Sequence, residues 1–211
     1  MIALAKQEGL YTSLSTNAQG MNRLLADQLV VSGLDHIIVS IDGLSEESYN
    51  AYRQGGSLHK ALDGLCYVRQ AKKKHNAHIR IELQCLRLKS NEHEWQLLKR
   101  NYRHMGADTL TLKTAQFYDY EQGNDLMPSN SRYSRYIFDA TIGKYRPKNR
   151  QKSQKNIPCR RLWKGCVIDV HGNMLPCCFD KDGQHIFGNL VQSSLDDVWF
   201  SPQAILFRQS V

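Results

Sequence analysis

Four of the six cysteines in this 211-residue chain lie within twenty residues of one another, near its C-terminal end. They are Cys159, Cys166, Cys177 and Cys178, whereas Cys66 and Cys85 stand alone in apolar surroundings. Thiolates are the usual protein ligands of iron–sulfur clusters, and zinc accepts them too. Because a cytoplasmic chain keeps its thiols reduced, the grouping predicts a metal centre before disulfides. The alternative is a set of buried, purely structural cysteines.

The spacing of these cysteines predicts a β-hairpin that gathers them. Residues 166–170 and 173–177 have the pattern of two short strands, and Gly172 permits a tight turn between them. With a two-residue turn, Cys166 and Cys177 share one face and Cys178 points to the other. A three-residue turn places Cys178 with Cys166 instead. In both cases we expect that one of the two adjacent cysteines is not a ligand.

The elements that precede the cysteines alternate between short apolar runs and amphipathic stretches. We expect strands at residues 11–15, 36–41, 79–83 and 109–112, and helices at residues 21–31, 58–75 and 91–105. Asn91 is the expected N-cap of the last of these helices. Strands separated by helices imply βαβ units in a parallel sheet or barrel. Four strands do not close a barrel, so we expect a partial (β/α) barrel in a chain truncated at both ends.

Polar residues follow the predicted strands at their C-terminal ends. Thr16 and Asn17 follow the first strand, Ser40 and Asp42 the second, and Gln84 the third. In parallel α/β folds, ligands bind at this edge of the sheet. Helix N-caps prefer the same residue types, so capping and turn formation are the alternative explanation.

The cysteine segment resembles the SPASM domain of radical S-adenosylmethionine (SAM) enzymes. The family pattern is a cysteine, nine to fifteen residues, a glycine, four residues and a cysteine, which Cys159, Gly172 and Cys177 fit. The resemblance continues to Arg208. It implies that Cys159 and Cys177 ligate an auxiliary 4Fe-4S cluster, with Cys166 as a candidate third ligand and the role of Cys178 left open. The family's further cysteines, which follow the position of Arg208, do not occur in this sequence.

The first half of the chain resembles the later part of a radical SAM barrel. Residues 12–18 resemble the third strand of the family with its Thr-Asn turn, and residues 37–43 resemble the fourth. The chemistry of a SAM site agrees, because Asp accepts hydrogen bonds from a ribose diol and Arg binds a carboxylate bidentately. The resemblance implies SAM contacts from Ser40 and Asp42 at the ribose, from Arg53 at the methionine carboxylate, and from Thr16 and Asn17.

The motif that holds the catalytic cluster in that family is missing. Neither Cys-x3-Cys-x2-Cys nor the Gly-Gly-Glu segment of the second strand occurs in this sequence. The resemblance implies a parent oxidoreductase that cleaves SAM reductively and modifies a peptide or protein substrate by hydrogen abstraction. We expect the chain alone to be inactive in SAM cleavage. The alternative is a non-catalytic iron–sulfur or zinc-binding module with an electron-transfer or structural role.

We divide the chain into a partial radical SAM barrel at residues 1–118, a loop and basic linker at residues 119–156, and a SPASM-like iron–sulfur domain at residues 157–211. From Lys144 to Lys164 there are nine lysines and arginines and no acid, within a net charge of +8. We interpret this stretch as a solvated linker. An anionic partner, such as a nucleic acid or substrate phosphates, is the weaker alternative.

The composition is that of an ordinary globular protein, with 41% hydrophobic and 23% charged residues. No apolar run approaches the length of a membrane-spanning helix. The first residues lack the apolar core and the cleavage site of a signal peptide. We therefore expect a cytoplasmic protein without a membrane partner.

Overall fold

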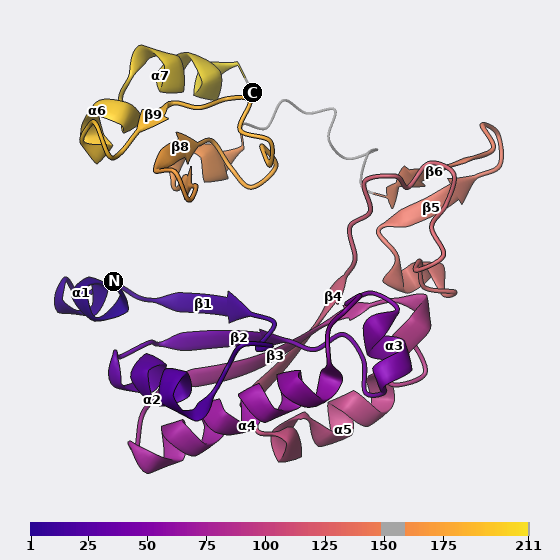
Figure 1. Cartoon of the computed structure of the whole chain (residues 1–211). Helices are drawn as coiled ribbons and strands as arrows, with labels where there is room; N and C mark the ends of the chain where they lie inside the picture. The colour runs from indigo at the N-terminus through magenta and orange to yellow at the C-terminus, as the bar shows by residue number, and fades with distance from the viewer. Residues whose placement is uncertain (149–158, 211) are drawn as a thin grey trace. The chain divides into compact units, whose positions relative to one another are not determined.

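The computed structural model describes residues 1–148 and 159–210 of the chain (Figure 1). The chain divides into two compact units between Lys148 and Asn149. Each unit has its own sheet and its own apolar core, so we describe them separately.

The first unit is built on a parallel sheet with the strand order β1-β2-β3-β4. Its strands are β1 (Ser13–Thr16), β2 (His36–Ser40), β3 (Arg80–Arg87) and β4 (Thr109–Thr114). This confirms the predicted parallel α/β architecture. The third strand runs on to Arg87, beyond its expected end at residue 83, because it stays paired with β4 as far as Thr114.

The helices of the first unit are α1 (Ile2–Gln7), α2 (Arg23–Val31), α3 (Glu46–Asn50), α4 (Leu58–Lys74) and α5 (Trp95–Met105). Helices α2, α4 and α5 lie on one face of the sheet (Figure 1). Side-chain caps fix where two of them begin, since Asn22 accepts from the Leu25 N–H at 2.9 Å and Ser57 from the Lys60 N–H at 3.3 Å. Helix α5 ends at Gly106, whose φ of 111° is left-handed.

The core of the first unit lies between the sheet and these helices. Alternate strand residues such as Ile37, Val39 and Leu83 are fully buried there. Burying each such side chain contributes about 1.5–3 kcal/mol. The residues between them in sequence face the opposite side of the sheet, where His36 Nε2 lies 3.1 Å from Glu82 Oε2.

Residues 119–148 differ from the loop that we expected there. They contain a short 3-10 helix at Ser131–Tyr133 and an antiparallel hairpin of β5 (Tyr136–Asp139) and β6 (Lys144–Pro147). These strands are too short for their alternation to stand out in the sequence. Residues 149–156 of the predicted linker lie outside the described residues.

The second unit contains a three-stranded antiparallel sheet in the order β7-β8-β9. Its elements are η4 (Arg160–Trp163), β7 (Val167–Ile168), β8 (Asn173–Leu175), β9 (Gly188–Asn189), α6 (Leu195–Trp199) and α7 (Pro202–Gln209). Met174, Phe187, Val198 and Ala204 form its small core. Strands β7 and β8 pair in the antiparallel direction, so the hairpin expected in the cysteine-bearing region is present.

None of the helices in the described ranges combines the length and apolar character that a bilayer crossing requires.

Candidate functional site

The C-terminal edge of the parallel sheet gathers the residues predicted to contact SAM. Thr16 and Ser40 end neighbouring strands, and Ser40 lies opposite Gln84 of β3. The structure brings Asp42 and Arg53 into direct contact, with Arg53 Nε 2.7 Å from Asp42 Oδ2. The sequence placed these two residues eleven positions apart with no signal that they pair.

The carboxylate of Asp42 is buried, with 1% of its side chain exposed, and two groups of the chain compensate its charge. Arg53 Nε donates to one oxygen, and the Leu86 N–H donates to the other at 2.6 Å. A buried carboxylate is tolerated when it is paired and hydrogen-bonded in this way. Each oxygen keeps a further lone pair, and a ribose contact by Asp42 would have to use these.

The guanidinium of Arg53 is held by Asp42 through one nitrogen only. The Arg53 side chain is 28% exposed, and its Cζ atom lies 5.5 Å from the centroid of the Tyr52 ring. No residue in the described part of the chain hydrogen-bonds its two terminal nitrogens. These nitrogens are therefore available as a fork that fits a carboxylate.

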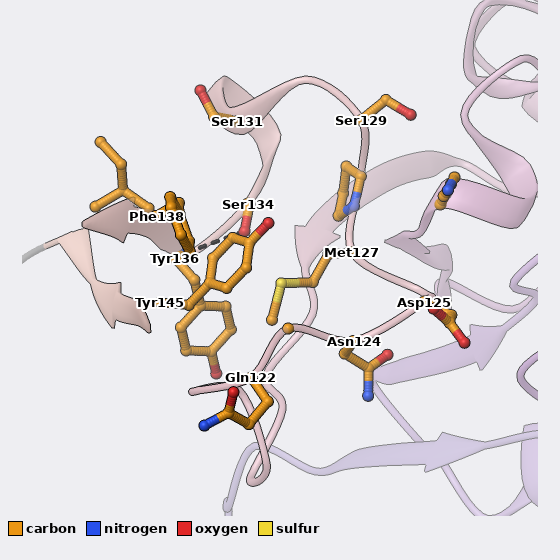
Figure 2. A pocket seen from close by; sticks show the side chains of 14 residues that line it. Gln122, Asn124, Asp125, Met127, Ser129, Ser131, Ser134, Tyr136, Phe138 and Tyr145 are labelled. Carbon is orange, nitrogen blue, oxygen red and sulfur yellow. Dashed lines mark hydrogen bonds between the residues drawn. The ribbon is translucent and has the colours of Figure 1, made fainter. Parts of the chain in front are cut away.

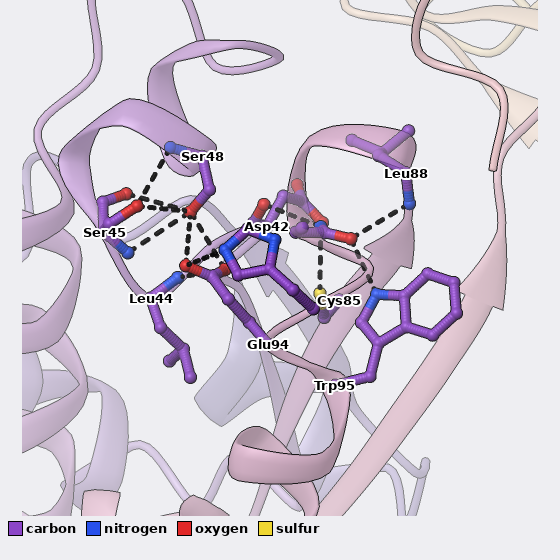
Figure 3. Close-up of polar contacts among 10 residues, drawn as sticks. Asp42, Leu44, Ser45, Ser48, Cys85, Leu88, Glu94 and Trp95 are labelled. Carbon is purple, nitrogen blue, oxygen red and sulfur yellow. Dashed lines mark hydrogen bonds and ion pairs between the residues drawn. The ribbon is translucent and has the colours of Figure 1, made fainter. Parts of the chain in front are cut away.

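A buried hydrogen-bond network anchors the loop that carries Asp42 (Figure 3). Asn91 is 1% exposed, and its side-chain amide donates to the Asp42 and Leu86 carbonyls, both at 2.9 Å. Its side-chain oxygen accepts from the Leu88 N–H at 3.0 Å and from the Trp95 indole at 2.7 Å. Asn91 is thus not the N-cap of α5 that we predicted, because the helix begins at Trp95 and the side chain joins β2 to β3 instead.

Glu94 makes a second link in the same network. It accepts from the Leu44 N–H at 2.8 Å and from the Ser48 hydroxyl at 2.9 Å (Figure 3). The turn at Gly43 fits so closely that an added Cβ would lie 2.4 Å from Ser48 Oγ. Sequence reasoning missed Glu94 because an isolated acid in an amphipathic stretch is typical of a solvent-exposed position.

Thr16 and Asn17 stabilise the turn after β1 with their own side chains. Thr16 Oγ1 accepts from the Ala18 N–H at 3.0 Å, and Asn17 Oδ1 accepts from the Gln19 N–H at 3.1 Å. Ala18 has a φ of 57°, a conformation that such a turn must hold in place. This is the turn chemistry that was the alternative to a ligand role, and the SAM contact of these two residues stays a prediction.

The register of the cysteine hairpin corresponds to the three-residue turn. Val167 pairs with Leu175 and Ile168 with Met174, and the Asp169 N–H donates to the Asn173 carbonyl at 3.0 Å. The Asp169 carboxylate closes the turn by accepting from two backbone N–H groups at 2.8 and 2.9 Å. The Asn173 side-chain amide also donates to this carboxylate at 3.0 Å, and this bond lowers the pKa of Asp169 most, with the two backbone bonds adding to the effect.

Three of the four clustered cysteines line one hollow of about 270 Å³. They are Cys166, Cys177 and Cys178, and the basic residues Arg161 and Lys164 lie beside them. Cys159 is exposed and is not part of the lining. All four are free thiols, and burial raises the pKa of the Cys166 thiol against the opposing effect of Arg208. The soft sulfur donors and the adjacent cations suit an anionic iron–sulfur cluster.

In the described ranges, no three His, Cys, Asp or Glu side chains come close enough together to hold a metal ion. Cys159 sits at the N-terminal end of η4, so a shift of this short element relative to the hairpin changes its distance from the hollow.

Arg208 ties the segment between Cys159 and Cys166 to the C-terminal helices. It is 3% exposed, donates to the Leu162 carbonyl of η4 at 2.9 Å and to the Trp199 carbonyl of α6 at 2.6 Å. Its guanidinium also lies 3.8 Å from the centroid of the Trp199 ring. The sequence indicated Arg208 only as part of a pattern, and its structural role follows from these contacts.

Three of the six basic residues of this stretch that the structure describes are engaged within the chain. Lys144 pairs with Glu121 at 2.9 Å and Arg146 with Asp139 at 2.8 Å, while Lys148 donates to the Ser131 carbonyl. Arg150, Lys152 and Lys155 lie outside the described residues. A nucleic-acid surface is thus not favoured by the three cations of β6 and its end.

Comparisons with known proteins agree with this organisation. Residues 159–211 match the SPASM family, an iron–sulfur cluster-binding domain. A PqqA peptide cyclase from Rhizobium meliloti (strain 1021) is 25% identical over an alignment of 218 positions, gaps included, that covers 95% of this chain and 56% of that protein. Streptococcus suis SuiB superposes with a TM-score of 0.66 at 12% identity, over 99% of this chain and 53% of SuiB.

The protein anSMEcpe, solved with bound AdoMet, superposes with a TM-score of 0.59 at 14% identity, over 93% of this chain and 56% of its own. At these identities the two solved structures establish the fold. The chain spans about half the length of the relatives it matches. Residues 159–211 thus match the SPASM iron–sulfur domain, and the chain shares its fold with SuiB and anSMEcpe.

Proposed function

We propose that this chain supplies part of the SAM site and the auxiliary cluster domain of an enzyme that modifies a peptide by radical chemistry. The observation that carries the proposal is the pairing of Arg53 with the buried Asp42 at the ligand-binding edge of the sheet, in a chain that also has the SPASM cysteines. A peptide substrate is supported by the PqqA peptide cyclase and by SuiB, which was solved bound to its precursor peptide SuiA.

Arg53 would bind the methionine carboxylate of SAM through its two terminal nitrogens. Asp42 fixes the direction of that fork and, with Ser40, would face the ribose, while Thr16 and Asn17 would close the site beside β1. When bound, SAM supplies a 5′-deoxyadenosyl radical on reductive cleavage, which abstracts hydrogen from the substrate. The protein's task at this edge is to hold the carboxylate and ribose in one orientation.

The affinity for SAM tests this site, measured by isothermal titration calorimetry on the full chain. We expect Arg53→Ala to weaken binding by roughly tenfold or more, since a charged hydrogen bond is worth about 1.5–3 kcal/mol. Arg103→Ala is the matched control, because Arg103 is a surface residue of α5 that stacks on Tyr102. Equal affinity of the Arg53→Ala variant and the wild-type chain would exclude the assignment.

An auxiliary 4Fe-4S cluster would be held by Cys159 and Cys177, with Cys166 or Cys178 as a further ligand. The shared hollow favours Cys166, Cys177 and Cys178 as neighbours, and Cys159 would join them through a movement of η4. Iron and sulfide are to be quantified after anaerobic reconstitution. We expect Cys177→Ser to lose the cluster and Cys66→Ser to retain it, because Cys66 lies on α4 in the other unit.

The same measurement distinguishes the alternative module. Colourless protein with tetrahedral zinc bound to the cysteines would indicate a structural metal site. We further propose that these 211 residues do not cleave SAM by themselves, because they lack the Cys-x3-Cys-x2-Cys motif. Formation of 5′-deoxyadenosine above background by the reconstituted chain would contradict this.

A further inference from the structure

A cavity of about 790 Å³ lies against the β5–β6 hairpin and shares no lining residue with the cysteine hollow or the Asp42–Arg53 pair (Figure 2). This volume is within the range of roughly 300–1,000 Å³ that is typical of ligand sites. Tyr136, Phe138 and Tyr145 line one side, and Met127 faces them (Figure 2). The rest of the lining is mostly uncharged and polar, from Gln122, Asn124, Ser129, Ser131 and Ser134.

The aromatic side of this cavity combines a fixed part with an exposed one. Tyr136 is 5% exposed, stacks on Tyr120 at 4.7 Å and shares two hydrogen bonds of 2.8 Å with the Phe117 backbone. Phe138 packs edge-on against Tyr145 at 5.3 Å, yet 54% of it is exposed. A rigid aromatic surface with one exposed ring is typical of an anchor for an apolar side chain.

The hairpin also presents an unpaired backbone edge. The Tyr145 N–H donates to the Glu121 carbonyl, so it points away from β5. Its cross-strand partner Phe138 is then a non-hydrogen-bonded position, whose N–H and C=O point outward on the other edge. The Tyr136 N–H points the same way and is satisfied by Ser134 Oγ at 3.0 Å. Among the described residues, nothing pairs with the backbone of Phe138.

We propose that an extended segment of the peptide substrate adds to the outer edge of β5 and places an apolar or aromatic side chain in this cavity. The inference rests on the peptide substrate of the proposed function. Backbone pairing would supply affinity, and the cavity would select the side chain. Lys89 and Asp125 are the only charged residues of the lining, so a peptide fits it better than a phosphate-bearing ligand does.

Two fluorescein-labelled nonapeptide libraries of mixed sequence test the site, one with Phe and one with Gly at the central position. Anisotropy with the full chain should show that the Phe library binds at least about tenfold more tightly, as expected for burial of one aromatic side chain. N-methylation of the two residues that flank Phe should weaken binding by about tenfold or more, because it removes the donors for strand pairing.

Phe138→Ala should abolish the preference for Phe. Ile142→Ala is the matched control and should stay within about twofold of wild type, because Ile142 is 60% exposed on the same hairpin and outside the cavity. Circular dichroism establishes that both variants fold, and the N-methylated peptides test the edge without any variant.

Equal binding of the two libraries, or indifference to N-methylation, would overturn the proposal. A doubled mass in sedimentation that Phe138→Ala abolishes would also overturn it, by assigning the edge to a second copy of the chain. The assay uses neither iron nor SAM. If the chain binds the cluster and SAM but not the peptides, only the peptide-site proposal fails. If it binds the peptides but neither the cluster nor SAM, the cofactor proposals fail.

Discussion

Replacing Asn91 by alanine should destabilise the first unit more than any loss of a surface polar residue. The substitution leaves two buried donors without acceptors, the Leu88 N–H and the Trp95 indole N–H, at about 1–3 kcal/mol each. The Asp42 carbonyl also loses its partner, whereas the Leu86 carbonyl still accepts from the Cys85 thiol at 3.3 Å. The free energy of unfolding should therefore fall by about 4 kcal/mol.

Urea denaturation followed by far-UV circular dichroism measures this change, because the three longest helices all lie in the first unit. Asn50→Ala is the control. Asn50 also donates two side-chain hydrogen bonds, both to Glu46 at an exposed position, and its loss should cost less than about 1 kcal/mol. If the free energy of unfolding of Asn91→Ala lies within about 1 kcal/mol of the wild-type value, the network does not hold the Asp42 loop in the way we argue.

Three further predictions concern other parts of the chain. Arg208→Met should destabilise the second unit by about 2–4 kcal/mol, because one buried and one part-buried carbonyl lose their donor, and tryptophan fluorescence in urea would report it. The lysine and backbone partners of Asp35 lower its pKa to about 2. The stability that its ionised form contributes is fully present above about pH 4 and is lost as the pH falls toward 2. Thermal unfolding of Asp35→Asn measured across this pH range should lack that decrease. Burial raises the pKa of the Cys85 thiol, so native iodoacetamide labelling followed by mass spectrometry should modify the exposed Cys66 and spare Cys85 until urea is added.

The strands and long helices of the first unit could be predicted because each has a strong local signal. The run from His36 to Ile41 is apolar and β-branched, and the structure has β2 there. Helix α4 begins one residue after its cap Ser57 and keeps its apolar stripe against the sheet. The hairpin of β5 and β6 had no such signal, since four-residue strands give too few positions for a period of two to emerge.

The sequence analysis left the register of the cysteine hairpin open between two turn lengths. Gly172 allows both turn lengths, and its φ of 82° shows only that a left-handed residue was required. The choice is made by Asp169, whose carboxylate accepts from the backbone of His171 and Asn173 and so spans a three-residue turn. An aspartate before a glycine turn is a signal of that geometry, and reading it would have placed Cys166 and Cys178 on one side.

The orientation of Arg53 depends on residues distant in sequence from it. Arg53 is aimed by Asp42, Asp42 is held by the backbone of Leu86, and both strand ends are joined by Asn91. A motif search finds the arginine and the aspartate but not the buried amide that joins the two strand ends behind them. Because an ion pair with one buried partner depends on such fixed geometry, substitutions at Asn91 should alter the proposed SAM site without contacting SAM. An Asn91 variant that remains folded but loses its SAM affinity would separate this positioning role from a general loss of stability.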